Sequence, residues 1–365
     1  MIESSHKDRD EDVDAVKYLK APDITLRVTE KCNLHCIHCF ADSGSSTVSE
    51  LETDEIKGII DWAARNGSFR LGITGGEPTL REDILEIIGY AREKNLWTIM
   101  VTNGFSLTEE LCKGLRDTGI NQVDVSVDNS HAEAHDYFRG QKGSFERATC
   151  AVKTLLKYGI PTAVTSVASA WNVNDLPSLY QLARELGATS FRLDVFIAIG
   201  RGESNLALTP EQFKNVYEWV NTLHDPDITV DRFSNQFDFL YTNKYQPDIL
   251  EVACGHKGVP LCEAGIARCS IKADGTVSPC SYFCTPEFYA GNIRENTLDG
   301  IWHESDVLKK FRQPHTYEGA CESCEYHTVC RGGCRARAYY MGGNLYGPDP
   351  YCWVASKGGS NVQKS

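Results

Sequence analysis

The chain has 365 residues and a formal net charge of −13. An acidic chain repels a phosphate backbone, so this balance excludes a typical nucleic-acid-binding protein. No apolar run approaches the length of a membrane span, and the acidic first residues lack the apolar centre of a secretion signal. We therefore predict a cytoplasmic protein with neither nucleic-acid nor membrane partners.

Six apolar stretches rich in β-branched residues predict buried strands, because parallel strands covered on both faces are continuously hydrophobic. In chain order they span 24–28, 69–73, 97–101, 123–127, 163–167 and 191–195. Apolar residues recur at helical spacing between these stretches. Thr53 and Ser144 are expected to cap helices, and Gly67 and Gly159 to end them.

Strands that alternate with helices indicate parallel β/α units, and six units predict an α/β fold with a partial (β/α)6 TIM-like barrel. A chain of this length is expected to hold a second domain. We predict a flexible segment over 1–22, the barrel over 23–235, a small cysteine-rich iron-sulfur domain over 236–355 and a flexible tail over 356–365.

Three cysteines follow the first predicted strand at the spacing C-x3-C-x2-C, namely Cys32, Cys36 and Cys39. The chain has fifteen cysteines and no secretion signal, so short cysteine spacings indicate metal or cluster ligands better than disulfides. Three thiolates leave one coordination position of a 4Fe-4S cluster or a tetrahedral metal open, as at catalytic centres. We therefore predict an enzyme.

Polar motifs also follow the next strands. Gly75-Gly76-Glu77-Pro78 follows the second, Thr102-Asn103-Gly104 the third, and Asp128 the fourth. The carboxyl ends of parallel strands meet at one rim, where such folds carry their sites. Together with the cysteine loop, these motifs over the first 230 or so residues resemble the radical S-adenosylmethionine (SAM) superfamily.

The resemblance implies specific roles. Cys32, Cys36 and Cys39 would bind a 4Fe-4S cluster whose open iron holds SAM, with His38 beside the last cysteine. Gly75, Gly76, Glu77 and Pro78 would hold the methionine amino end of SAM. Its ribose or carboxylate would contact Ser126 and Asp128, and the weaker candidates for the pocket are Thr102, Asn103, Ser166 and Arg192. Ordinary strand-end capping is an equal alternative for Ser126, Ser166 and Asn103.

Seven of the cysteines after residue 250 form an ordered series: Cys262, Cys280, Cys321, Cys324, Cys330, Cys334 and Cys352. This series resembles the SPASM domain, which carries up to two auxiliary 4Fe-4S clusters. The series includes an expected hairpin turn at Asp274-Gly275. The resemblance implies Cys262, Cys280 and Cys334 for the first cluster and Cys321, Cys324, Cys330 and Cys352 for the second. The fourth ligand of the first stays open among Cys269, Cys254 and Cys284, and a leftover thiol could donate hydrogen to a substrate radical.

Alternatives remain for several of these residues. A zinc ribbon is the alternative for the cysteines from Cys321 to Cys334. Arg331, Arg335 and Arg337 either offset cluster charge or form a solvated helix face. The remaining cysteines, Cys112 and Cys150, fall within helical patterns and are predicted to be core residues.

The resemblance implies an oxidoreductase that generates a 5'-deoxyadenosyl radical and draws its electron from a flavodoxin- or ferredoxin-type reductant. The first hypothesis for the substrate is a ribosomally made peptide, because the C-terminal series looks most like maturases of the mycofactocin and pyrroloquinoline quinone types. Only about two dozen residues precede the first strand, too few for a folded leader-binding domain, so a separate leader-binding protein is expected.

Two further hypotheses remain. One is a small-molecule oxidoreductase that acts on a sugar, an aminoglycoside or a tetrapyrrole side chain of the haem pathway. Relatives that oxidise sulfatases place an aspartate after a cluster cysteine, whereas here Ser281 follows Cys280, and no catalytic acid or base is assigned. The other is a non-catalytic iron-sulfur or zinc scaffold.

Overall fold

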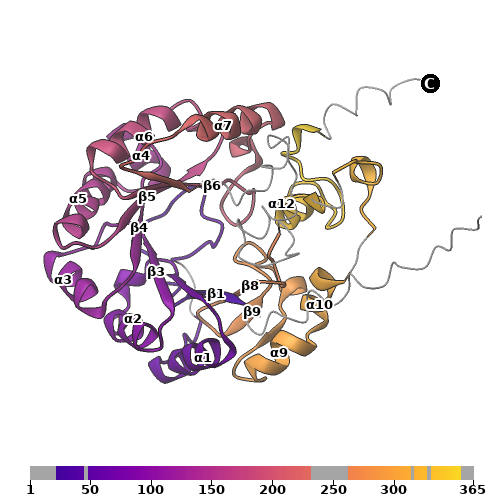
Figure 1. The fold of residues 1–365 in the computed structure, drawn as a ribbon, viewed down its shortest axis with the longest axis horizontal. Coiled ribbons are helices and arrows are strands. Elements are labelled where there is room, and N and C mark those ends of the chain that lie inside the picture. The colour runs from indigo at the N-terminus through magenta and orange to yellow at the C-terminus, as the bar shows by residue number, and fades with distance from the viewer. Residues whose placement is uncertain (1–21, 45–47, 232–261, 314–315, 327–329, 355–365) are drawn as a thin grey trace, which may run out of the picture.

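The computed structural model describes residues 22–44, 48–231, 262–313, 316–326 and 330–354. Seven parallel strands curve around one side of the molecule (Figure 1): β1 (Asp23–Arg27), β2 (Arg70–Thr74), β3 (Trp97–Thr102), β4 (Gln122–Ser126), β5 (Thr162–Ala168), β6 (Ser190–Val195) and β7 (Thr229–Asp231). The six predicted strands are all present, and each boundary lies within one residue of its prediction. This confirms the α/β fold and its partial barrel.

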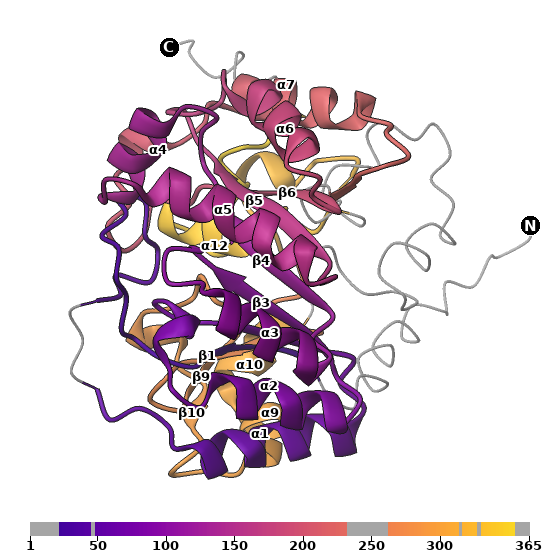
Figure 2. The ribbon, with the colours of Figure 1, turned by 90° about the vertical axis from the view of Figure 1, so that its left-hand side faces the viewer.

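Helices cover the convex face of the sheet, as Figures 1 and 2 show. They are α1 (Thr53–Asn66), α2 (Ile84–Glu93), α3 (Glu109–Thr118), α4 (Ala132–Arg139), α5 (Ser144–Lys157), α6 (Leu176–Glu185) and α7 (Pro210–Thr222). Gly67 and Gly159 adopt left-handed backbone conformations where α1 and α5 end, as predicted. The predicted caps were wrong by one residue, because α1 and α5 already include Thr53 and Ser144, whose hydroxyls bind Asp83 and Asp136.

The C-terminal segment extends the same sheet. β8 (Arg268–Ile271) pairs in parallel with β1, and β9 (Thr276–Ser278) and β10 (Gly291–Asn292) continue outward in antiparallel pairing. The predicted hairpin turn at Asp274-Gly275 joins β8 to β9. Helices α9 (Leu298–Glu304), α10 (Asp306–Arg312) and α12 (Arg335–Tyr340) follow, and α12 lies on the concave side of the sheet (Figure 2).

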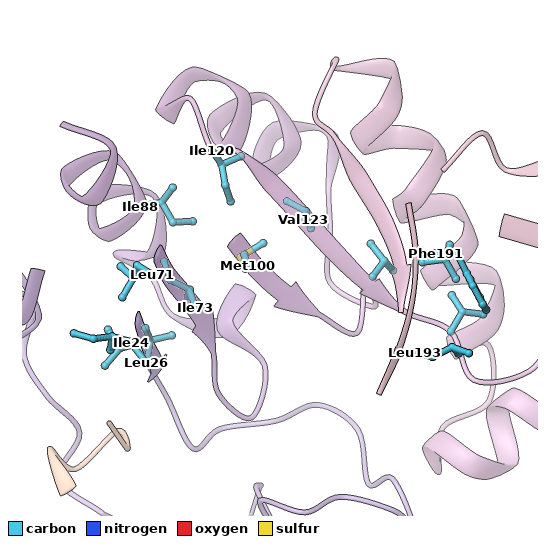
Figure 3. Packing of buried hydrophobic residues seen from close by; sticks show 14 of the residues in the cluster. Ile24, Leu26, Leu71, Ile73, Ile88, Met100, Ile120, Val123, Phe191 and Leu193 are labelled. Carbon is cyan, nitrogen blue, oxygen red and sulfur yellow. The ribbon is translucent and has the colours of Figure 1, made fainter. Parts of the chain in front are cut away.

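The two faces of the strands differ in polarity, which corrects the prediction that apolar residues cover both. Ile24, Leu26, Leu71 and Ile73 lie in the core between the strands and the helices, as do Phe191 and Leu193 (Figure 3). Their neighbours on the concave face include two ion pairs, Asp23 with Arg70 and Asp124 with Arg192, and on β3 the apolar Ile99 and Val101. The strands were therefore recognisable from one continuously apolar face, while the other lines a lumen of mixed polarity.

Helices in the described part of the chain are all too short or too polar to cross a membrane.

Candidate active site

The Gly-Gly pair holds the start of the cysteine loop. The amides of Gly76 and Glu77 donate to the carbonyls of Thr29 and Lys31, each at 2.7 Å. A Cβ added to Gly76 would lie 2.2 Å from the Lys31 carbonyl oxygen, and one at Gly75 would lie 2.6 Å from that of Thr29. The glycines are therefore required by the close approach of the backbone that leads directly into Cys32.

Glu77 joins the ends of β2 and β3. Its Oε1 accepts from Thr79 and from the Thr102 hydroxyl (2.6 Å), while Oε2 accepts from the Asn103 amide (2.8 Å). Burial raises the pKa of Glu77, and these donors offset part of that effect. The Asn103 side chain continues the chain of contacts by donating to Asn33, the neighbour of Cys32, at 2.8 Å. Glu77 and Asn103, both predicted from the sequence, thus position the loop from inside the protein. Pro78 begins the 3-10 turn Pro78–Leu80 beside them.

The far side of the loop rests on two glycine-containing turns. The Ile37 amide donates to the Phe138 carbonyl at 3.1 Å, and the Arg201 amide donates to that of Cys39 at 3.0 Å. The Arg201 guanidinium also reaches the Cys36 carbonyl at 3.0 Å. A Cβ on Gly140 or Gly200 would collide with loop carbonyls at 2.4 Å. The loop is therefore fixed from both sides of the barrel mouth.

The three thiols of the loop act on one another. Cys36 is buried, and Cys32 and Cys39 are partly exposed. Burial raises the pKa of Cys32 to about 11, and the Cys36 and Cys39 charges act in the same direction. No three His, Cys, Asp or Glu side chains in the described ranges are arranged to hold a single metal ion. Each cysteine of a 4Fe-4S cluster binds a different iron, so a cluster does not require thiols converging on one ion.

A buried charged group lies beneath the loop, at the end of β4. Asp128 Oδ2 lies 2.6 Å from Arg139 Nη2, and Arg139 Nη1 lies 3.8 Å from Cys36 Sγ. His38 stacks on Phe138 at 4.1 Å, with its Nε2 3.6 Å from Asp128. Burial alone would raise the pKa of Asp128, but the guanidinium of Arg139 leads the effects that outweigh burial and lower the value to about 2. Burial lowers the pKa of His38 to about 3, so its ring is neutral.

Arg139 was missed in the sequence, because an arginine before a glycine at the end of a helix is an ordinary C-terminal pattern. Its contacts with Asp128 and Cys36 arise only in the folded chain. It places a buried positive charge next to a loop thiol, where a thiolate or the carboxylate of a ligand would be stabilised.

The remaining predicted pocket residues are divided between two environments. Ser166 is buried and bonds Asp128 Oδ1 at 3.2 Å, with Asn172 beside it. Ser126 is half-buried and faces the lumen from the last position of β4. Arg192 lies deeper in the lumen, 3.3 Å from Asp124.

The C-terminal cysteines influence one another electrostatically, and Cys262, Cys280 and Cys334 also pack in one hydrophobic cluster. Burial raises the pKa of Cys280 to about 12, and the charges of Cys262 and Cys334 add to the shift. Burial likewise raises the pKa of Cys330 to about 12. The charges of Cys352, Asp349 and Cys321 act in the same direction, in decreasing order. The charge of Cys324 in turn helps to raise the pKa of Cys321. Their role as ligands stays a prediction.

The additional thiols are in different places. Cys269 is buried in the main core on β8, and burial raises its pKa to about 12 without a described cysteine among the groups acting on it. Cys284 packs in the same cluster as Cys262, Cys280 and Cys334, with its Sγ 3.9 Å from the Phe40 carbonyl. Cys254 lies outside the described residues. Cys112 is buried as predicted, whereas the core prediction for Cys150 was wrong, because it is exposed on the outer face of α5.

A buried ion pair connects the two C-terminal cysteine groups. Arg337 Nη2 donates to Asp349 Oδ2 at 2.6 Å, and the same oxygen accepts from the Cys334 amide at 2.9 Å. The Asp349 carbonyl accepts from the Cys352 amide at 2.9 Å. Arg335 is also buried and binds the Leu345 and Gly347 carbonyls. A solvated face is therefore the wrong description of α12, although the preceding Arg331 is exposed.

The fold and the three cysteine groups define an iron-sulfur enzyme with its site at the mouth of a partial barrel. Residues 26–183 match the radical SAM superfamily, and residues 262–325 match SPASM, an iron-sulfur cluster-binding domain. The chain is 34% identical to an AdoMet-dependent heme synthase of Methanosarcina barkeri, over 90% of this chain and 95% of that protein. It is 35% identical to the mycofactocin maturase MftC of Mycolicibacterium smegmatis, over 90% and 82% respectively.

Solved structures share the fold. Streptococcus suis SuiB bound to its precursor peptide SuiA superposes with a TM-score of 0.78 at 16% identity, covering 93% of this chain and 78% of that one. AdoMet-bound anSMEcpe gives 0.68 at 19% identity, covering 92% and 94%. The chain belongs to the radical SAM superfamily and carries a SPASM domain, as its motifs predicted. It is an enzyme whose cofactors are iron-sulfur clusters and SAM.

The residues present fit these cofactors. Each cysteine group consists of thiols whose mutual repulsion, added to burial, raises the pKa of its members, and cluster iron would relieve that repulsion. The buried Nδ1 of His38 has no hydrogen-bond partner within the described residues. Beside it, Arg139 offers a positive charge, which suits a ligand that carries a carboxylate.

Proposed function

We propose that the chain is an oxidoreductase in which Cys32, Cys36 and Cys39 hold the SAM-binding 4Fe-4S cluster. The observation that carries this proposal is the convergence of that loop with Gly75, Gly76 and Glu77 at one rim of the lumen. Bound there, the cluster and SAM would supply the radical chemistry that removes a hydrogen atom from the substrate.

The residues of the chain position these groups. Glu77 and Asn103 fix the loop through Asn33, and Gly75 and Gly76 admit its backbone. Arg139 stabilises the thiolate of Cys36 and offers a positive charge for a SAM carboxylate, while Asp128 holds that guanidinium in place. Ser126 faces the lumen, where it suits a contact with the ribose.

The two C-terminal groups are proposed to hold auxiliary 4Fe-4S clusters, one at Cys262, Cys280 and Cys334 and the other at Cys321, Cys324, Cys330 and Cys352. Cys284 is the additional thiol that we place next to the first group, because Cys269 lies in the separate main core. Cys284 therefore replaces Cys269 as the first candidate for a further ligand or a hydrogen donor.

We propose a ribosomally made peptide as the substrate, modified with the help of a separate leader-binding protein and a flavodoxin- or ferredoxin-type reductant. The likeness to the mycofactocin maturases over 90% of the chain supports this substrate class. A tetrapyrrole side chain is the second candidate, favoured by the equally extensive likeness to the heme synthases.

Anaerobic reconstitution with iron and sulfide tests the proposal. Three 4Fe-4S clusters predict about twelve irons per chain, and dithionite with SAM is expected to release 5'-deoxyadenosine. Replacing Cys32, Cys36 and Cys39 by alanine should remove about four irons and abolish release. Release that persists in this variant, or a site filled by zinc, would contradict the assignment. The corresponding replacement of the exposed Cys150 is the control and should change neither quantity.

A further inference from the structure

Asp194 occupies the last inward-facing position of β6. Burial alternates along this strand, and its neighbours Leu193 and Val195 are in the core on the helix side, where Figure 3 shows Leu193. Asp194 pairs in register with Val167 of β5, whose amide donates to Asp128 Oδ1 at 3.0 Å. Asp194 is therefore level with Asp128, at the rim where the cysteine loop lies.

The carboxylate of Asp194 has no ionic or hydrogen-bonding partner within the described ranges, and it is half-buried. Other inward-facing acids are matched by arginines: Asp124 by Arg192 at 3.3 Å, Asp23 by Arg70 at 3.6 Å and Glu263 by Arg268 at 2.6 Å. Arg192 shares a face with Asp194 but is engaged by Asp124. Because these acids are paired, Asp194 is a negative charge without a counter-charge in the described part of the lumen.

Tyr282 approaches this position from the C-terminal segment. It follows Cys280 by two residues, and its ring meets that of Phe40, the neighbour of Cys39, edge-on at 5.2 Å. The side chain is half-buried, and no described residue bonds its hydroxyl. Tyr282 also belongs to the same hydrophobic cluster as Ile197 and Ile199, which follow Asp194 just beyond the end of β6, so it lies at the same end of that strand. Tyr282 thus connects the loop of Cys39, the lumen and the Cys280 group.

A substrate that enters this lumen removes water from both groups. A carboxylate left unpaired on desolvation costs free energy, so the bound molecule must supply a hydrogen-bond donor, and a cation supplies the strongest. A site built to bond a polar group also rejects analogues that lack it. A second carboxylate would be repelled at short range.

We propose that Asp194 and Tyr282 form a substrate-binding pair that takes a protonated amine, or a comparable donor group, of a peptide side chain. This inference rests on the proposed function, because it places the substrate in the same lumen. It favours a peptide over a tetrapyrrole, since the propionate side chains of a tetrapyrrole are anionic and would be repelled by the carboxylate of Asp194.

Binding of three amino-acid probes tests the pair directly. Nα-acetyl-lysine amide, the apolar Nα-acetyl-norleucine amide and the acidic Nα-acetyl-glutamate amide are titrated into the reconstituted full-length protein with SAM present, with binding followed by saturation-transfer NMR. We expect the lysine probe to bind about tenfold more tightly than the norleucine probe, and the glutamate probe to bind most weakly. Equal affinities for the lysine and glutamate probes would overturn the proposal.

Matched variants assign the effect to the pair. Asp194→Asn should reduce the lysine-to-norleucine preference to about one, and Asp194→Glu should retain it, which keeps the test valid if the asparagine variant loses iron. Tyr282→Phe should weaken all three probes several-fold without removing the preference. Asp117→Asn, at an exposed carboxylate on α3, should match the wild type. A preference that survives Asp194→Asn with full iron content would refute the pair.

SAM cleavage, measured on the same samples, separates this inference from the proposed function. Cleavage without a preference for the lysine probe rejects the binding pair alone. Absence of cleavage in the fully iron-loaded wild type rejects the proposed function, whatever the probes do.

Discussion

Replacing Asp349 by alanine should disrupt both C-terminal cysteine groups, while the loop of Cys32, Cys36 and Cys39 keeps its iron. The side chains of Asp349 and Arg337 are 1% and 5% exposed, and the carboxylate also accepts from the Cys334 and Tyr351 amides. Removing one partner of a buried pair costs about 3–5 kcal/mol, because the other charge stays buried and unpaired. With a denaturant slope of about 3 kcal/mol/M, the midpoint of urea unfolding falls by about 1–2 M.

The assay combines urea unfolding with iron counting after reconstitution. Because the Asp349 carboxylate accepts from the amides of Cys334 and of Tyr351, the neighbour of Cys352, both auxiliary groups should lose iron, leaving about four of twelve irons. The control Asp306→Ala removes a carboxylate that is 94% exposed, 3.8 Å from Lys309, and should shift stability by less than about 0.5 kcal/mol. An Asp349→Ala protein with an unchanged midpoint and full iron would refute the reasoning.

Three further changes probe the rim. Gly76→Ala should displace residues 29–31, because the new Cβ would lie 2.2 Å from the Lys31 carbonyl, and iron counting should show about four irons lost; Gly58→Ala, with no atom within 4 Å, is the control. Glu77→Gln replaces an acceptor by a donor facing Thr102 or Asn103, so SAM affinity and urea stability should fall, the latter by about 1–3 kcal/mol, whereas the exposed Glu82→Gln should change neither. His135, buried with a pKa lowered from 6.5 to about 4, is neutral in the folded state and takes up a proton on unfolding below pH 6.5. Stability should therefore fall by up to about 2 kcal/mol between pH 6.5 and 5, and His135→Gln should flatten this slope in urea unfolding; an unchanged slope would contradict the assignment.

The strands were predictable because their outward-facing residues, such as Leu71 and Ile73, form one continuous core with the helices. The inward-facing residues gave no comparable signal, since Arg70 and Asp194 are ordinary polar residues until the sheet curves. β7, β9 and β10 have two or three residues each, too few for any periodicity. The fold was therefore readable from one face of the sheet.

The site was predictable only where local spacing carries the chemistry, as in the C-x3-C-x2-C loop and the Gly-Gly pair. The grouping of the C-terminal cysteines came from a family resemblance, because spacing alone does not say which distant thiols meet. Arg139 and Asp349 gave no local signal, since Arg139 contacts Cys36, 103 residues away, and Asp349 contacts Arg337 across 12. Buried ion pairs of this kind become visible only once the chain is folded.

The central claim is that the 4Fe-4S cluster held by Cys32, Cys36 and Cys39 leaves its fourth iron without a protein ligand, so that this iron can bind SAM. Electron-nuclear double resonance of the dithionite-reduced, fully reconstituted protein with SAM labelled by ¹⁵N at its amino group tests it most directly. We predict a ¹⁵N coupling to the reduced cluster that disappears when Cys36 is replaced by alanine. A spectrum that SAM leaves unchanged, in protein with its full iron content, would contradict the claim.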